Sequence, residues 1–277
     1  MVAPWLGGTD TLTGAFIGTD LIVNTRKSFL GGLVALAFAF LSPPAAATSF
    51  NINLSFLGGL TASQERVFER AEAFWEGRIA GYQDGISITG LTISAAGIPV
   101  DGEGGFAGLA TPMGSVVQNG FTLATFSTMQ FDTSDLAALE GNGTLFDVVV
   151  REMAHAIGFG TMWSFNGPYV NGSGLYSGAN ALAAYRAEFD PDAEFIPVEL
   201  NGGLGSADIL WAENWAGGPD ELMTASVDTP TFISNTTLAS LEDIGFLLTV
   251  PIPSSILLGL TVLCVFVVIA RRKKFRA

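Results

Sequence analysis

Hydrophobic and polar residues alternate in the stretch SFNINLSFLG (49–58), and this period of two predicts a first β-strand. The next stretch, TASQERVFERAEAFWEGRI, repeats its apolar side chains every three or four residues, which predicts an amphipathic helix that packs on the sheet. Thr61 is the predicted N-cap of this helix, and Glu65 follows in its first turn. We therefore expect the folded region to begin with a strand and a helix.

The same patterns predict the elements that follow. GISITGLTISAAGIPVDG predicts two more strands, and the glycine-rich VDGEGGFAGLATPM predicts a loop. TFSTMQFDTSDLAAL predicts a strand and then a helix that is capped at Ser134 or Asp135. A central helix is predicted in NGTLFDVVVREMAHAIGFG, where Gly158 ends it. The rest is expected to be rich in loops, with one short helix near 179–187 and a last helix in TTLASLEDIGF.

The N-terminal residues 1–47 have the composition of a processing segment. Arg26 and Lys27 precede the apolar run FLGGLVALAFAFL, and the small residues Ala45–Ala47 offer a cleavage site, which together predict a secretory signal peptide. A run of about thirteen apolar residues is short for the alternative, a transmembrane helix. The residues before Val23 contain no Lys or Arg, so we expect an N-terminal extension there and a true translation start near Val23.

The C-terminal segment 250–277 has three parts, namely the proline motif VPIP, an apolar run from Ile256 to Ala270, and a basic end from Arg271 onwards. The apolar run is short for a spanning helix, although snorkelling cations extend its reach and favour a cytoplasmic end. This tail resembles the bacterial PEP-CTERM and VPLPA-CTERM sorting signals. The resemblance implies cleavage by a membrane sorting protease, and a simple transmembrane anchor is the alternative.

The middle region, 48–249, is strongly acidic. It holds five arginines, no lysine and 24 Asp and Glu residues, which gives a formal charge of −19. Such a charge argues against nucleic acid and anionic membranes as partners. The chain's one cysteine, Cys264, lies in the tail, which excludes disulfides and cysteine zinc sites from this region.

The stretch REMAHAIGFGTMW has nearly the form of a zinc-peptidase helix, H-E-x-x-H. Residues i and i+4 share one helical face, so two imidazoles can reach one zinc ion, and the glutamate between them polarises a metal-bound water. Here Glu152 and His155 are present, but Arg151 stands where the first histidine would be, and its permanent cation would repel a metal. His155 is the chain's one histidine, and a lone helical histidine is more often a packed core residue than a ligand.

This stretch is followed in order by YSGANALAAY, PVELNGGLGSADILW, ELMT and LASLEDIGF. Together they resemble the leishmanolysin family of metzincin zinc peptidases, from about Phe50 to Phe246. The resemblance implies an α+β, metzincin-like zinc-peptidase fold for the domain 48–249. It would have a twisted mixed sheet, an active-site helix beneath the sheet, and a loop-rich C-terminal part.

The resemblance also assigns single positions. Three of them keep the family's residue, namely Glu152 as general base, Gly158 as the helix-ending turn and Met223 as the methionine turn. Of the three zinc histidines, His155 alone remains, because Arg151 occupies the first position and Leu210, in GSADILW, the third. One imidazole does not hold zinc at useful affinity, so no cofactor is expected.

Two interpretations of this incomplete site compete. The first is a catalytically impaired metallopeptidase homologue of the bacterial cell envelope, whose cleft binds a peptide or protein segment. In it, the Arg151 cation replaces the metal's charge and neutralises a cluster of Glu152 and Asp208. Helix geometry does not put Arg151 and Glu152 face to face, so this pairing needs long side-chain reach.

The second is an active zinc-dependent metalloendopeptidase with an unusual ligand set. Asp208 and Glu213 flank Leu210 and carboxylates bind zinc, so a set of His155, Asp208 and Glu152 is conceivable, although it would use up the general base. In both, the protein is exported, and is either held by its tail or released or surface-attached after processing.

Overall fold

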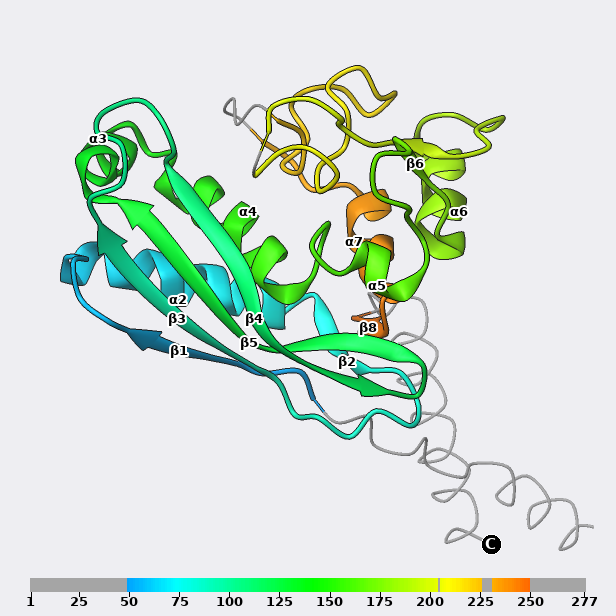
Figure 1. Ribbon diagram of the computed structural model, residues 1–277, viewed down its shortest axis with the longest axis horizontal. Coiled ribbons are helices and arrows are strands. Elements are labelled where there is room, and N and C mark those ends of the chain that lie inside the picture. The colour runs from blue at the N-terminus through cyan, green and yellow to red at the C-terminus, as the bar shows by residue number, and fades with distance from the viewer. Residues whose placement is uncertain (1–48, 204, 226–230, 250–277) are drawn as a thin grey trace, which may run out of the picture. The chain divides into compact units, whose positions relative to one another are not determined.

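The computed structural model describes residues 49–203, 205–225 and 231–249, which form a mixed α+β structure (Figure 1). A four-stranded sheet with helices on one face is followed by a loop-rich part, so the predicted α+β class with a mixed sheet is confirmed. The predicted signal peptide and tail lie outside the described residues. Within the described ranges, no helix is long and apolar enough to cross a membrane.

The main sheet contains, in spatial order, β1 (Ile52–Phe56), β3 (Leu91–Ile98), β5 (Phe121–Asp132) and β4 (Gly108–Gln118). The first three strands run parallel, and β4 pairs antiparallel with β5 at the edge. The sequence-based loop over VDGEGGFAGLATPM is therefore partly wrong, because GLATPM begins a long edge strand. Its Gly and Pro residues weaken strand propensity, whereas pairing through a tight Asn119–Gly120 turn with positive φ stabilises the hairpin.

GISITGLTISAAGIPVDG forms one strand instead of the predicted two, because β3 begins at Leu91 and residues 86–90 are irregular. Four short strands were not predicted, namely β2 (Ile79–Tyr82), β6 (Leu175–Tyr176), β7 (Ile196–Pro197) and β8 (Phe246–Leu248). They pair as β2 with β8 and β6 with β7, both antiparallel. The first pair joins the end of the described domain to its beginning, a long-range contact that local patterns do not reveal.

Helices α2 (Ala62–Glu76) and α3 (Thr133–Asn142) begin at side-chain caps. Thr61 caps α2 as predicted, but its capping box is completed by Gln64 and not by Glu65. The cap of α3 is Asp132, whose carboxylate accepts the Ser134 N–H, so the predicted caps Ser134 and Asp135 are wrong. The same carboxylate accepts backbone N–H groups of the 101–102 loop, which hold its pKa well below the usual range.

Helix α4 (Leu145–Ile157) is the predicted central helix, and it ends at Gly158 with φ of +138°. It packs beside α2 on the same face of the sheet (Figure 1). The buried Trp75 of α2 donates its indole N–H to the Val150 carbonyl of α4 at 3.0 Å. This bond satisfies a buried donor and fixes the two helices against each other.

The C-terminal part contains three helices, α5 (Trp163–Asn166), α6 (Ala179–Glu188) and α7 (Asn235–Glu242), and the two predicted there are confirmed as α6 and α7. Helices α6 and α7 cap each other. Asp243, after α7, accepts the N–H groups of Asn180 and Ala181, and Glu188, at the end of α6, accepts those of Asn235 and Thr236. Each helix therefore satisfies the free N-terminal donors of the other.

Stacked aromatic rings form the core of this loop-rich part. Trp163 stacks on Trp211 with ring centroids 4.8 Å apart, and Trp211 stacks on Trp215 at 5.6 Å. Tyr185 of α6 continues the stack on Trp215, also at 5.6 Å. Large rings bury much apolar area per residue, which compensates for the small amount of regular structure here.

The reciprocal caps predict a specific loss of stability. Asp243→Ala should lower the free energy of unfolding by about 1–2 kcal/mol, because it leaves the α6 donors without an acceptor. The exposed Glu194 provides a control, and Glu194→Ala should change stability by less than about 0.5 kcal/mol. Urea unfolding followed by tryptophan fluorescence measures both. Equal losses in the two variants would contradict the capping role.

Candidate functional site

Helix α4 carries Arg151, Glu152 and His155 through the interior of the protein. Ten of its residues are buried, including Arg151 and His155, so the helix is enclosed on nearly all sides. A buried ionisable side chain is costly unless neighbouring groups compensate it. The partners of these three side chains therefore define what the site can do.

The Arg151 guanidinium is only 7% exposed, and its Nη1 donates to the Ala225 carbonyl oxygen at 3.3 Å. Burial lowers its pKa, while the negative charges of Glu152, Glu213 and Glu221 raise it. Three carboxylates therefore act electrostatically on this buried cation. The guanidinium compensates negative charge from its own helix, at Glu152, and from the C-terminal part, at Glu213 and Glu221.

The expected pairing of Arg151 with Asp208 does not form, since both side chains are described and no hydrogen bond or ion pair joins them. Asp208 has a φ of +68°, and its carboxylate accepts the Gly172 N–H at 2.7 Å and the Tyr169 hydroxyl. The Asp208 carboxylate therefore holds the 169–174 loop and is not paired with Arg151. The idea of Asp208 as a replacement zinc ligand loses its support for the same reason.

Glu152 lies under the edge strand β4. Its carboxylate accepts the backbone N–H of Ala110, and a Cβ at Gly108 would stand 3.2 Å from its Cγ. Burial raises the pKa of Glu152 to about 7, against an opposing effect of the Arg151 charge and of the Ala110 bond. Glu152 is therefore bound to the sheet edge and is partly protonated near neutral pH.

His155 is 2% exposed, and its Nδ1 lies 3.0 Å from the Phe159 carbonyl oxygen. Burial lowers its pKa to about 4, so the ring is neutral and Nδ1 carries the proton that it donates to that oxygen. Its Nε2 is buried and has no hydrogen-bond partner among the described residues. Metal-binding histidines often donate their second N–H to a backbone carbonyl, so this one imidazole has the arrangement of a ligand.

The segments that hold Leu210 and Met223 run next to each other and next to the end of α4. The Trp211 N–H donates to the Met223 carbonyl at 2.9 Å, and both Leu210 and Met223 are fully buried. A Cβ at Gly160, just after α4, would lie 2.3 Å from the Ile209 carbonyl oxygen. Positions that are far apart in the sequence therefore meet in one region, but Leu210 brings an apolar side chain to it.

Glu221 is a residue of this region that the sequence reading missed. It is fully buried and accepts the N–H groups of Met223 and Ser234 at 2.6 and 3.0 Å, and the Thr237 hydroxyl. Burial raises the pKa of its carboxyl against the effect of these bonds. A glutamate two residues before the methionine was the available signal, and its role is to shape the turn that holds Met223.

Two pockets adjoin β4. The first, the α4 pocket, has a volume of about 370 Å³ and includes Arg151 and Glu152 in its wall. Its other walls are formed by the 105–108 stretch, the start of α4 with Thr144 and Val148, and the glycine-rich loop around Gly205. Arg151 and Glu152 are therefore accessible from one side, across the edge of the sheet.

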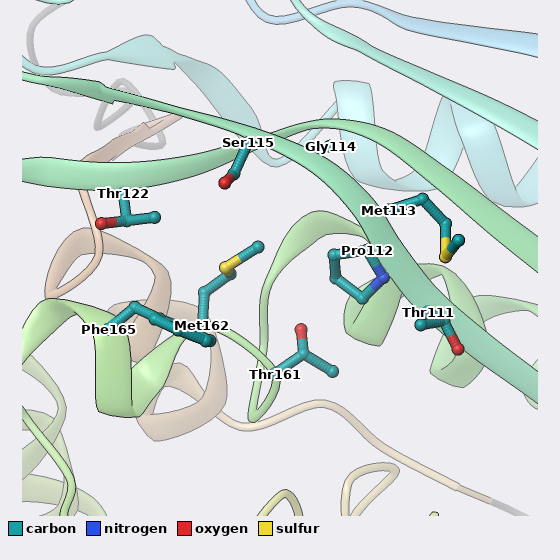
Figure 2. Close-up of a pocket in the computed structure, with 9 residues that line it drawn as sticks. All are labelled: Thr111, Pro112, Met113, Gly114, Ser115, Thr122, Thr161, Met162 and Phe165. Carbon is teal, nitrogen blue, oxygen red and sulfur yellow. The ribbon is translucent and has the colours of Figure 1, made fainter.

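The second pocket, the β4 pocket, has a volume of about 390 Å³ and lies farther along the same strand (Figure 2). Figure 2 shows residues 111–115 on one side of it and Met162 and Phe165 on the other. The ring of Phe165 is 67% exposed and the Met113 side chain 63%. A bulge at Pro112–Ser115 interrupts the strand pairing there, so this pocket offers apolar and adaptable side chains.

Within residues 49–203, 205–225 and 231–249, no three His, Cys, Asp or Glu side chains are grouped so that they could hold a metal ion. No family model matches the chain, and no curated protein matches it either. Its function is therefore inferred from the contacts and charges of the site.

Two ionisable groups of α4, the buried His155 and the partly buried Glu152, predict opposite pH dependences of stability. The folded-state pKa of His155 is lowered from 6.5 to about 4, so the unfolded chain binds more protons in that window and stability rises with pH, by about 3 kcal/mol in total. The folded-state pKa of Glu152 is raised from 4.5 to about 7, so its contribution to stability falls as pH rises through that window.

Urea unfolding of His155→Asn and Glu152→Gln between about pH 4.5 and 7 separates the two effects. The stability of His155→Asn should rise less with pH than that of the natural chain, because the contribution of the imidazole is gone. The stability of Glu152→Gln should rise more steeply than that of the natural chain, because the opposing contribution of the carboxyl is gone. Variants with the same pH profile as the natural chain would show that neither group is buried as described.

Proposed function

We propose that this chain is an exported, leishmanolysin-like protein of the bacterial cell envelope whose cleft binds peptide or protein segments without hydrolysing them. The observation that carries the proposal is the buried guanidinium of Arg151, which lies beside Glu152 and one helical turn before His155. A metzincin-like fold is part of the proposal. The mixed sheet, the enclosed central helix and the Met223 turn next to the Leu210 segment support it.

The residues at the site do not fit a zinc ion. His155 offers a suitable Nε2, but a zinc site uses three or four protein ligands, and the other two expected positions hold a cation and an aliphatic side chain. Glu152 is bonded to Ala110, and Arg151 supplies the positive charge that compensates it. Peptide hydrolysis of the zinc-peptidase type is therefore not proposed for this chain.

The surroundings of Arg151 suit the binding of an extended segment. Strand β4 is the edge of the sheet, and exposed edges take up extended peptides in many proteins. The α4 and β4 pockets, which both adjoin this strand, would receive side chains of such a segment. The guanidinium of Arg151 would donate to its carbonyl oxygens, as a planar group with several N–H donors.

An active zinc metalloendopeptidase with an unusual ligand set is the alternative function, and the unpartnered Nε2 of His155 favours it. Asp208 is bonded to the 169–174 loop, so its second ligand would come from the other carboxylates first considered, Glu152 and Glu213. The tail belongs to both proposals. Its resemblance to a sorting signal supports a membrane sorting protease as a partner and a location in the cell envelope.

Binding of unfolded casein tests the proposed function. The natural chain should bind fluorescently labelled casein, leave it intact, and bind it equally well with a chelator present. Thr144→Trp, which fills the α4 pocket, should weaken binding about tenfold, whereas Asn171→Trp on an exposed loop should not. Fluorescence polarisation and gel electrophoresis measure the two effects. Casein cleavage that a chelator stops would establish the alternative, and absence of binding would refute the proposal.

Restoring the histidines tests the assignment of the site. Arg151→His together with Leu210→His should take up close to one zinc ion per chain, because three imidazoles then meet and the repelling cation is gone. Arg151→His alone should bind zinc weakly, and Leu210→His alone should bind little. Metal analysis after equilibrium dialysis gives the stoichiometry, and far-UV circular dichroism checks folding. A folded double variant with no more zinc than the natural chain would show that Leu210 is not the third-ligand position.

A further inference from the structure

Helix α2 carries two exposed arginines, Arg66 and Arg70, one helical turn apart. Like charges at this spacing repel each other and lower the stability of a helix. The region 48–249 contains 24 acidic residues, and all of them except Asp228 lie in the described ranges. None of the described ones forms an ion pair or a hydrogen bond with Arg66 or Arg70. The two cations are therefore left without a described carboxylate partner in a strongly acidic region.

The glutamates of α2 form a separate row on another side of the helix. Glu65, Glu69, Glu72 and Glu76 follow one another at intervals of three or four residues, so they share one side. Glu76 accepts the Ile52 N–H of β1 at 2.8 Å, which directs this side towards β1. Burial, together with the charges of Glu76 and Glu69, raises the pKa of Glu72. Positive and negative charges on α2 are thus segregated into two rows and do not compensate each other.

Arg66 and Arg70 line a pocket of about 380 Å³, which we call the arginine pocket. Its other walls come from α2, the end of α3 and the start of α4, namely Ser63, Val67, Glu140, Gly143, Leu145 and Phe146. Arg70 lies over the Phe146 ring, with its Cζ 4.6 Å from the ring centroid. Guanidinium N–H groups point outwards in the plane of the group, so contact with a ring face leaves them free to bind an anion. Glu140 is the acidic residue of the wall, and its carboxylate accepts the Gln64 side-chain amide at 3.3 Å.

The start of α4 adds to the positive potential of this pocket, which it meets through Leu145 and Phe146. Its N-cap, Thr144, makes no side-chain cap, because the hydroxyl donates to the Asn142 side-chain oxygen at 2.6 Å. Asp147, the acidic residue of the first turn, lines a different pocket. The positive end of the helix dipole therefore supports the two arginines, although the arginines supply the full charges.

We infer that the arginine pocket binds a tetrahedral oxyanion with two negative charges, the group that phosphate, sulfate and phosphate monoesters share. Each guanidinium offers one positive charge and a fork of N–H donors, so the pair matches such a dianion in charge and in donors. A carboxylate carries one charge and pairs with one fork, which would leave the second cation without a partner. The α4 pocket lies on another side of α4, with Val148 and Arg151 in its wall, so anion binding here is independent of the proposed function.

Phosphate binding by the full chain in mild detergent tests the inference. At about pH 7.5 inorganic phosphate is largely a dianion, and NaCl keeps the ionic strength constant. Phosphate at about ten times its dissociation constant should raise the melting temperature by about 3–5 °C. Arg66→Gln and Arg70→Gln should each raise the dissociation constant about tenfold or more, because one charged fork is lost. Isothermal titration calorimetry measures the constant. Asn171→Asp is the matched control, since it lowers the net charge by the same amount on an exposed loop, and it should bind like the natural chain.

The same titration with glycerol 1-phosphate identifies the source of the anion. Equal affinity would show that the pocket accepts an esterified phosphate, whereas binding of inorganic phosphate alone would restrict it to the free anion, and both results support the inference. A natural chain that phosphate stabilises no more than NaCl does would refute it. Equal binding by Arg66→Gln, Arg70→Gln and Asn171→Asp would refute it too, since the anion would then be held elsewhere. Glutamine keeps the helix propensity of arginine, and circular dichroism of each variant confirms the fold.

Discussion

The buried positive charge of Arg151 is the constraint on which the arrangement of the site depends. The Arg151 guanidinium is 7% exposed. A buried cation of this kind destabilises the folded protein unless carboxylates or carbonyl oxygens, such as that of Ala225, compensate it. Here Glu152 comes from the same helix and Glu221 from the loop that shapes the Met223 turn. Helix α4 and the C-terminal part are therefore linked by charge compensation, and under the proposed function this is the place where a zinc peptidase would use a metal.

Contacts that are remote in sequence hold the elements that create this environment. Trp75 ties α2 to α4, and Trp211 joins the Leu210 segment to the Met223 turn through its backbone and to Thr237 through its indole. The aromatic stack around Trp211 and the mutual caps of α6 and α7 give the loop-rich part a fixed shape. The proposed binding of a peptide segment would benefit from this rigidity, since ordering a loop on binding costs conformational entropy.

The sequence predicted the helices better than the strands. Thr61 and Gly158 are local signals, so α2 and the end of α4 could be placed from the sequence alone. The start of β4 has the composition of a loop, because its Gly and Pro residues lower strand propensity and its stability comes from pairing with β5. In the site, Glu152 and His155 could be found by helical spacing. The role of Glu221 and the hydrogen bond of Asp208 to Gly172 could not be predicted, because both depend on contacts between distant loops.

The metal content of the natural protein tests the central claim, that the Arg151 cation takes the place of a metal. The full chain would be produced with zinc in the medium, dialysed, and analysed by mass spectrometry for bound metals. We expect far less than one zinc ion per chain and an unchanged melting temperature after treatment with a chelator. One zinc ion per chain, retained through dialysis and removed by the chelator with a loss of stability, would contradict the account.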